Sequence, residues 1–441
     1  MKHRRRSKQQ KLNSLPPPTP PATRAPCPMP RPSASPKSPP PATPPPEQGP
    51  EVVVPEDWAL ATDAISSDLS SPVVLVCGPS NSGKSTFTRL LLNKLLPSYG
   101  RVGYLDTDVG QPEFSPPGCL SLHIVDEAIT VSFLMPAFIL CKPIRCCFYG
   151  DISSKGDPES YLNSLFLLYT YFIEKYRCPG SEMLPLIVNT PGWVKGTGFD
   201  MLVEMLRYIC PTIVVPIRTR MQRKNLPDGM FWLTGGETEP KVITIDAASR
   251  DSLSKSSLKR KDGGGMRERR LVEYFKQCFS SDISLATNKE LAYALASLPP
   301  YEVPFSDVTV MHLHCEVPRT EIWHSVNATI VGLASSCDTP ATAHAVPWCV
   351  GLGIVRGVDV QRGLLYVITP VDVQHLQSVD LLLQGLIEIP RSVLQVKGCE
   401  SPYMSTNVRD KITGKDLYAS NLNSPLSRQD DGDSDSGADT M

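Results

Sequence analysis

The segment from Gly78 to Thr86 has the residue types and spacing of a loop that binds nucleotide phosphates. It reads GPSNSGKST, a glycine followed by four residues and then by glycine, lysine and serine. The glycines of this pattern let backbone N–H groups point at phosphate oxygens, in front of the positive end of the next helix. Lys84 would reach the β- and γ-phosphate oxygens, and Ser85 would offer its hydroxyl to Mg²⁺. The candidate phosphate-binding residues are Gly78, Pro79, Ser80, Asn81, Ser82, Gly83, Lys84, Ser85 and Thr86.

Two acids follow in the segment YLDTDVGQ, residues 104–111. Acids at the carboxyl end of a strand in a doubly wound sheet lie at the mouth of the ligand crevice. Because side chains alternate along a strand, we expect Asp106 and Asp108 to point to the same side. One carboxylate could support Mg²⁺ while the other accepts the proton of an attacking hydroxyl. We expect Asp108 to be the base and Asp106 the metal support, although the residue types do not distinguish the two roles.

Trp193 lies among the glycines of GWVKGTG, residues 192–198. An aromatic ring on a loop at the crevice mouth can stack on a nucleobase. The alternative is that the ring packs beneath its own loop. Thr190 and Lys195, on either side of it, are candidate phosphate contacts.

Four basic residues follow the apolar run Ile213–Val215 and could form a lid. An arginine such as Arg218 could close over the transferring phosphoryl group and neutralise its developing charge. The alternative is that these bases only form a solvated face. They are Arg218, Arg220, Arg223 and Lys224.

Alternating strands and helices are predicted to position these residues. The apolar run Val73–Cys77 predicts a buried strand before the phosphate loop, and Lys84–Leu96 has helical periodicity. Further strands are expected at Val102–Leu105, Pro185–Val188 and Ile213–Val215, and helices at Ser160–Tyr176 and Phe199–Ile209. Strands separated by helices indicate an α/β fold, a P-loop NTPase parallel sheet with helices on both faces.

Composition indicates a soluble, intracellular protein. The chain has 441 residues, a net charge of −1 and 13 cysteines without a C-x-x-C pair, which favours a reducing compartment. The longest apolar runs, such as Val131–Cys141, are shorter than the roughly 20 residues that span a bilayer, so no membrane association is expected. The basic start of the chain could be a nuclear or nucleolar address or an RNA contact, or simply a solvated terminus.

Several motifs in order resemble those of the polynucleotide 5′-hydroxyl kinases. They are GPSNSGKST, YLDTDVGQPEFSPPG, FYGD, LIVNTPGWVKGTG and GLGIVRGVDVQRGLLYVITPV. They are most similar to the nucleolar pre-rRNA-processing branch (nucleolar protein nine type) and more distantly to the mRNA cleavage-factor kinase.

This resemblance implies ATP and Mg²⁺ as cofactors and phosphorylation of RNA 5′-OH ends. It also implies a role in processing the second internal transcribed spacer of pre-rRNA, with an endonuclease partner, in the nucleus and nucleolus. By motif, Asp108 is the acid of the family's Asp-x-Gly-Gln element, and Gln111 is similar to a substrate or nucleotide contact. Trp193 is similar to the RNA-clamping aromatic, and Arg218 occupies the lid position.

Six segments are expected along the chain. They are a disordered basic and Pro-rich tail (1–50), a short N-terminal remnant (51–72), a P-loop kinase domain (73–246), a flexible basic insertion with a connecting helix (247–300), a C-terminal β-rich domain (301–400) and an acidic disordered tail (401–441). The connecting helix is expected at Arg267–Phe279. The β-type runs are Val308–Leu313, Ala328–Leu333, Val350–Val355, Leu364–Ile368 and Val379–Ile389.

Two other functions remain compatible with these residues. The chain could be an ATP-binding, non-catalytic scaffold of an RNA-processing complex, which would need only the phosphate loop. It could also be a plain P-loop NTPase or a small-molecule kinase, which would hydrolyse or use ATP independently of RNA.

Overall fold

The structure is a computed structural model that describes eight ranges of the chain. They are residues 54–67, 70–129, 140–180, 183–233, 239–248, 263–280, 283–336 and 346–394, all within one compact unit, Val52–Met441. The expected tails at 1–50 and 401–441 lie outside the described residues. So do most of the apolar run Val131–Cys141 and residues 249–262 of the expected insertion.

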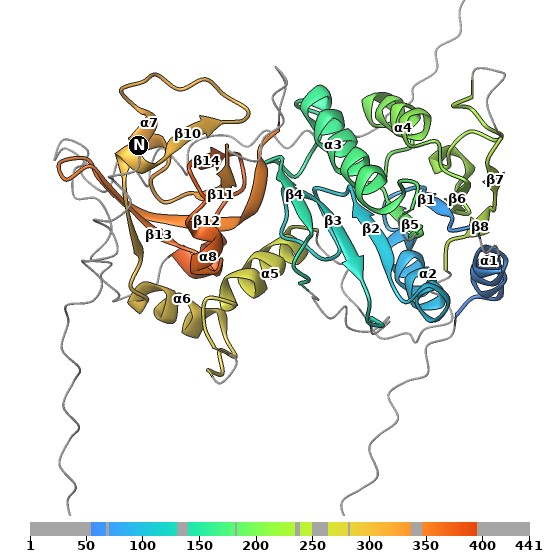
Figure 1. Ribbon diagram of the computed structural model, residues 1–441, viewed down its shortest axis with the longest axis horizontal. Helices are drawn as coiled ribbons and strands as arrows, with labels where there is room; N and C mark the ends of the chain where they lie inside the picture. The colour runs from blue at the N-terminus through green and yellow to red at the C-terminus, as the bar shows by residue number, and fades with distance from the viewer. Residues whose placement is uncertain are drawn as a thin grey trace, which may run out of the picture. The chain divides into compact units, whose positions relative to one another are not determined.

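The first sheet has eight strands and carries the phosphate loop (Figure 1). Its strands are β1 (Val73–Cys77), β2 (Val102–Asp106), β3 (Cys119–Val125), β4 (Arg145–Phe148), β5 (Leu186–Asn189), β6 (Ile213–Arg218), β7 (Lys241–Val242) and β8 (Ile245–Asp246). They lie in the order β4-β3-β2-β5-β1-β6-β7, and β8 also pairs with β6. Every pairing among β2, β5, β1, β6, β7 and β8 is parallel.

The expectation of a parallel sheet is therefore confirmed at its centre and wrong at one edge. There, β3 runs antiparallel to β2, and β4 runs antiparallel to β3. No helix lies between β2 and β3, so the chain returns directly alongside β2, as antiparallel strands can. The sheet is mixed because this short return replaces a helical crossover.

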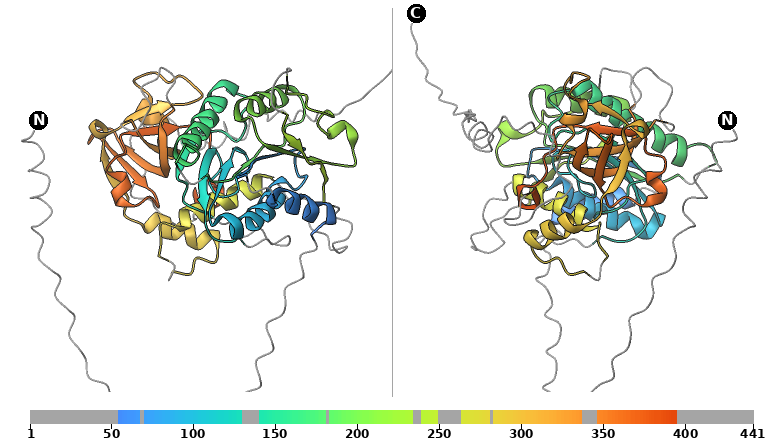
Figure 2. Two further views of the ribbon diagram at one scale, coloured as in Figure 1. Left: turned by 45° about the vertical axis from the view of Figure 1, so that its right-hand side comes forward. Right: turned by 90° about the vertical axis from the view of Figure 1, so that its left-hand side faces the viewer.

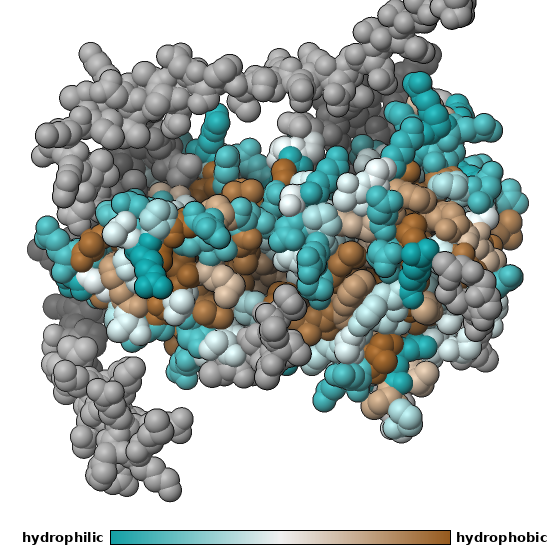
Figure 3. Space-filling view, turned by 90° about the horizontal axis from the view of Figure 1, so that it is seen from above, coloured by the Kyte–Doolittle hydropathy of each residue, from teal (hydrophilic) through white to brown (hydrophobic). Residues whose placement is uncertain are grey.

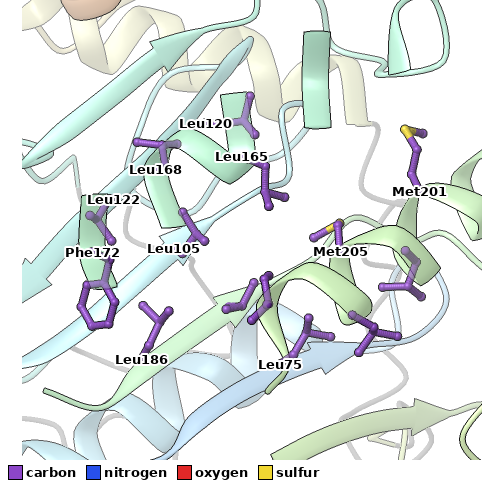
Figure 4. Packing of buried hydrophobic residues seen from close by; sticks show 14 of the residues in the cluster. Leu75, Leu105, Leu120, Leu122, Leu165, Leu168, Phe172, Leu186, Met201 and Met205 are labelled. Atoms are coloured by element: carbon purple, nitrogen blue, oxygen red, sulfur yellow. The ribbon is translucent and has the colours of Figure 1, made fainter. Parts of the chain in front are cut away.

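Helices cover both faces of this sheet, as expected. They are α1 (Glu56–Ser66), α2 (Lys84–Tyr99), α3 (Pro158–Tyr176) and α4 (Gly196–Ile209). Alternate residues of β1 enter different cores: Val74 packs with α1 and α2, whereas Leu75 packs with α3 and α4. Figure 4 shows the second of these cores, where leucines of the strands meet Leu165 and Phe172 of α3 and Met205 of α4.

Helix α1 lies in the segment expected to be a short remnant, and it packs against the phosphate loop. Trp58 is fully buried, and its indole N–H donates to the carbonyl oxygen of Asp246 at 2.8 Å. Its ring meets the Phe87 ring edge-on at 5.6 Å. A Cβ at Gly83 would lie 2.8 Å from the Trp58 ring, so the glycine lets α1 approach the loop closely.

The second sheet bears out the expected β-rich region. It has six strands in the order β10-β14-β11-β12-β13-β9. Figure 2 shows this sheet in the orange shades of the C-terminal part of the chain. They are β9 (Tyr301–Pro304), β10 (Thr309–His312), β11 (Ile330–Ser335), β12 (Trp348–Asp359), β13 (Leu364–Ile368) and β14 (Leu381–Gln384). Only β9 was not expected. It ends at Pro304 and forms an edge of the sheet, where a proline is tolerated.

Helices α5 (Gly263–Lys276) and α6 (Asn288–Ser297) connect the two sheets in sequence. Thr287 and Glu290 form a capping box at the start of α6. The remaining short helices are α7 (Ile322–Ser325), α8 (Val373–Leu376), α9 (Arg391–Leu394), η1 (Gln222–Lys224) and η3 (Phe305–Asp307).

Both sheets contribute to one shared core. Phe148 of β4, Phe275 of α5, Leu291 of α6 and Leu352 of β12 belong to the same buried cluster. The face in Figure 3 has hydrophilic and hydrophobic residues interspersed. Among the helices of the described ranges, none is long and apolar enough to cross a membrane.

Candidate active site

A cavity of about 530 Å³ lies at the carboxyl ends of β1 and β2. Five segments border it: the phosphate loop and the start of α2, the loop after β2, the loop after β4, the loop after β5, and the first turns of α5. The residues that line it include Ser80, Lys84, Ser85, Arg89, Asp108, Gln111, Glu113, Ile152, Ser153, Ser154, Lys155, Gly192, Trp193, Arg267 and Arg270. The cavity lies at the edge of the sheet where the sequence places the candidate site.

The phosphate loop has the tight turns that its glycines predict. Gly78 and Gly83 have φ values of 139° and 101°, and Asn81 has a φ of 61°. A Cβ at Gly78 would lie 2.5 Å from the carbonyl oxygen of Ile217, so no other residue fits there. The hydroxyl of Ser82 is buried and has no hydrogen-bond partner in the described part of the chain.

Lys84 is 7% exposed and lies within the phosphate loop. Its Nζ donates to the carbonyl oxygens of Gly78 at 3.0 Å and Pro79 at 2.9 Å. Burial lowers the pKa of Lys84 to about 8, an effect that the charge of Asp108 opposes. Carbonyl oxygens solvate an ammonium group without neutralising it, so the site favours a bound anion.

Asp108 borders the same cavity as Lys84. Its Oδ1 accepts the backbone N–H groups of Gly110 at 3.1 Å and Gln111 at 2.9 Å. Burial raises the pKa of Asp108, whereas these hydrogen bonds and Lys84 lower it. Because β2 ends at Asp106, a turn of the following loop positions Asp108, and strand alternation does not.

Asp106 is fully buried and does not border the cavity. Its Oδ1 accepts the Asn189 side-chain N–H at 3.1 Å, and its Oδ2 accepts the Glu113 backbone N–H. Burial raises its pKa to about 7. Both carboxylate oxygens hold neighbouring segments, so the side chain fixes the loop that carries Asp108. Metal support by Asp106 stays a prediction.

Comparisons with known proteins agree with this geometry. A family model described as "mRNA cleavage and polyadenylation factor CLP1 P-loop" matches residues 78–277, and one described as "NOL9-like, C-terminal domain" matches residues 296–390. The chain is 50% identical over 361 residues to the polynucleotide 5′-hydroxyl-kinase NOL9 of Arabidopsis thaliana, across 80% of this chain and 96% of that protein. The chain belongs to the NOL9-type polynucleotide 5′-hydroxyl-kinase family.

Animal relatives of the same name are longer. The chain is 35% identical to the NOL9 kinase of Danio rerio, and the match covers 78% of this chain and 50% of that protein. It is 32% identical to the NOL9 kinase of Homo sapiens, and this match covers 78% of this chain and 53% of that protein. It therefore spans about half the length of these two relatives. A solved structure of a Clp1p point mutant with Pcf11p matches with a TM-score of 0.50 at 16% identity, covering 74% of this chain and 78% of that one, which supports the fold.

Trp193 and Gln111 of this NOL9-type chain both border the cavity. The Trp193 ring meets Tyr161 edge-on at 5.2 Å, so it packs partly against its own neighbourhood while it lines the cavity. A Cβ at Gly192 would lie 2.1 Å from the hydroxyl oxygen of Ser80. This glycine therefore lets the tryptophan loop lie directly on the phosphate loop.

The structure does not place Arg218 or Thr190 in the cavity lining. Arg218 forms an ion pair with Asp228, on the far side of β1 from β2. Thr190 is fully buried, and its hydroxyl donates to the carbonyl oxygen of Val76 at 2.8 Å. Both side chains contact the protein itself outside the cavity, so the lid role of Arg218 and the substrate contact of Thr190 stay predictions.

Other charged residues, which the sequence reasoning missed, border the cavity. Arg89 forms an ion pair with Glu113 at 3.0 Å, and Arg270 donates to the Glu113 carbonyl oxygen at 2.6 Å. Arg267 and Lys155 complete the group. Arg89 could have been found, because it lies four residues after Ser85 and so on the same face of the predicted helix. With Lys84, five cations face two carboxylates, Asp108 and Glu113, which suits a polyanion.

The oxygen donors of this cavity fit Mg²⁺ that arrives with a nucleotide. Within the described ranges, no group of three or more His, Cys, Asp or Glu side chains could hold a metal ion. Mg²⁺ commonly binds through one or two protein oxygens together with substrate phosphates and water. The hydroxyl of Ser85 and the carboxylate of Asp108, which both border the cavity, are the candidates.

Proposed function

We propose that this chain is an ATP-dependent polynucleotide 5′-hydroxyl kinase that phosphorylates RNA 5′-OH ends. The observation that carries the proposal is that Lys84 and Asp108 border one cavity rich in cations, in a chain of the NOL9-type kinase family. A scaffold needs the phosphate loop alone, whereas this cavity adds an acid and arginines.

In the proposed reaction, the oxygen of the 5′-hydroxyl attacks the γ-phosphorus, and Asp108 accepts the proton that this hydroxyl loses. The bond between the γ-phosphorus and the bridging oxygen breaks, and ADP leaves with the electron pair. Lys84 holds β- and γ-phosphate oxygens, and Arg267 and Arg270 neutralise charge that develops on the transferring group. Mg²⁺ held near Ser85 would supply further neutralisation of the phosphates.

Trp193 and Gln111 are proposed to bind the terminal nucleotide of the RNA. An aromatic ring stacks on any base, so Trp193 would hold the end of the strand without selecting its sequence. Gln111 can donate and accept hydrogen bonds at the same rim of the cavity.

We further infer that the RNA is pre-rRNA that has been cut in its second internal transcribed spacer. The partner is then an endonuclease, and the protein acts in the nucleus and nucleolus. The support is the match of residues 296–390 to a NOL9-like C-terminal domain and the motif GQPEFSPPG. Colocalisation of a fluorescent fusion with a nucleolar marker tests the location.

The test of the activity is transfer of γ-labelled phosphate from ATP to a 5′-OH oligoribonucleotide, with an oligodeoxyribonucleotide in parallel. We expect labelled RNA ends. The rate of phosphate transfer should fall by about 100-fold or more in Lys84→Ala, because the substitution removes the ammonium group that contacts the transferring phosphate. Full activity in Lys84→Ala would refute the site. ATP binding without any transfer would favour the scaffold, and ATP hydrolysis at the same rate with and without RNA would favour a plain NTPase.

A further inference from the structure

A series of backbone hydrogen bonds joins two loops of the cavity to the second sheet. The N–H of Gly118 donates to the carbonyl oxygen of Val109, next to the proposed base Asp108, at 2.8 Å. The carbonyl oxygen of Gly118 accepts the N–H groups of Tyr149 at 2.8 Å and Gly150 at 3.0 Å. The N–H of Leu386, just after β14, donates to the carbonyl oxygen of Gly150 at 2.6 Å. One continuous set of bonds thus runs from β14 to the Asp108 loop.

Glycines make this junction possible. A Cβ at Gly385 would lie 2.3 Å from the carbonyl oxygen of Gly150 and 2.4 Å from its Cα. Gly150 and Gly118 have φ values of 82° and 84°, which side chains rarely adopt. A Cβ at Gly118 would lie 2.8 Å from the Ile387 side chain. The close approach leaves no room for a methyl group at these positions.

A chain of ring contacts leads from the second sheet to Trp193. The Nε2 of His314, just after β10, lies 2.7 Å from the carbonyl oxygen of Tyr149, so Nε2 carries the proton and donates. The His314 ring meets Tyr149 at 4.9 Å, Tyr149 meets Tyr161 at 5.9 Å, and Tyr161 meets Trp193 at 5.2 Å. The Tyr161 hydroxyl also donates to the carbonyl oxygen of Thr107 at 2.6 Å, beside Asp108.

We propose that the second sheet, through Gly385 and His314, positions the acceptor side of the active site. The positioned groups are Asp108, Trp193 and the loop Ile152–Lys155, which begins just after Gly150. None of the bonds and ring contacts named in this junction involves a residue of the phosphate loop. The second sheet therefore aligns the 5′-hydroxyl end for attack and leaves ATP binding to the first sheet. This inference rests on the proposed function, because it assigns a role within the same reaction.

The test compares Gly385→Ala with Gly156→Ala, a control just after the loop Ile152–Lys155, where a Cβ meets nothing within 4 Å. We expect Gly385→Ala to lower kcat/KM for the oligoribonucleotide by about 100-fold, because displacement of reacting groups by about 1 Å costs that much. The Kd for ATP should stay within about twofold of that of the unchanged chain. The substitution disturbs the position of the acceptor-side groups and leaves the nucleotide-binding loop in place. Gly156→Ala should match the unchanged chain in both measurements.

A second pair of variants addresses the same junction without added bulk. His314→Gln keeps a side-chain N–H donor for the Tyr149 carbonyl oxygen, whereas His314→Leu removes it. We expect His314→Leu to reduce transfer and His314→Gln to restore most of it, so this pair decides the matter if Gly385→Ala does not fold. The proposal would be overturned if Gly385→Ala or His314→Leu folded and kept the kinetic constants of the unchanged chain.

A readout without catalysis separates this inference from the proposed function. Lys155 is exposed on the positioned loop, so tryptic cleavage after Lys155 reports how firmly that loop is held. We expect faster cleavage in Gly385→Ala than in the unchanged chain, which has the same residues around the cleaved bond. If the unchanged chain transfers no phosphate, the kinase proposal fails, and equal cleavage rates in Gly385→Ala and the unchanged chain would separately refute the positioning role.

Discussion

At the scale of single residues, burial sets the chemistry of the two main catalytic candidates. Lys84 is held by carbonyl oxygens that do not cancel its charge, and Asp108 is held by two backbone N–H groups. Burial moves the pKa of each toward neutrality, down for Lys84 and up for Asp108. Groups with such pKa values are typical of active sites.

These shifts predict a bell-shaped pH profile. Lys84 must be protonated to hold phosphate, so kcat/KM for ATP should fall as pH rises above about 8, by about tenfold per unit. Asp108 must be ionised to accept a proton, and its raised pKa places the acid limb above the ordinary value of 3.8. Initial rates at low ATP, measured across the pH range, test both limbs.

The control for the alkaline limb is Lys84→Arg, whose guanidinium stays protonated throughout. The kcat/KM of Lys84→Arg should be lower than that of the unchanged chain at every pH. It should not decline between pH 8 and pH 10, because residue 84 then keeps its charge over this range. An equal decline in both proteins would show that another group is responsible.

At the scale of elements, the bases that border the cavity come from α5 and α2, not from the chain after β6. Arg267 and Arg270 lie one turn apart in α5, and Arg270 anchors that helix on the carbonyl oxygen of Glu113. Arg218 instead pairs with Asp228. Helix α5 is therefore the element that brings these two positive charges to the cavity.

This arrangement predicts different effects of three arginine substitutions. Arg267→Ala should reduce phosphoryl transfer by about 100-fold or more, because it removes a charge from the transferring group. Arg269→Ala and Arg218→Ala should each stay within about threefold of the unchanged chain, because exposed charges outside the cavity contribute little. Single-turnover rates at saturating ATP provide the comparison, and a large loss in Arg218→Ala with none in Arg267→Ala would restore the original lid assignment.

At the scale of the whole molecule, the two sheets are parts of one folding unit. The cluster that contains Cys119, Phe148, Phe275, Leu352 and Leu383 draws residues from both sheets and from α5. Neither sheet can be removed without exposing this apolar surface. A catalytic unit that ended before β9 would lose part of its core.

We therefore expect a single cooperative unfolding transition. Circular dichroism and tryptophan fluorescence should report the same urea midpoint, since Trp58 lies beside the first sheet and Trp348 in the second. A chain truncated at residue 300 should fail to give a soluble monomer with ATP-dependent stabilisation. Two separated transitions, or a soluble and ATP-stabilised truncated chain, would contradict the shared core.

The sequence alone determined the features that depend on local spacing. The phosphate loop, α2 and the acid at Asp108 follow from patterns within a few residues of one another. So do four of the eight strands of the first sheet, β1 among them, and five of the six strands of the second. Those patterns report backbone turns and the periodicity of buried faces, which neighbouring residues decide. The order of motifs likewise indicated the kinase family.

Only the tertiary structure decided which side chains meet. It separated Asp106 from Asp108, because the end of a buried strand and the following turn have different surroundings. It brought Arg267 and Arg270 to the cavity in place of Arg218, and it folded β3 and β4 back on β2. These contacts join segments far apart in the chain, and their energy comes from burial and charge pairing that no local pattern contains.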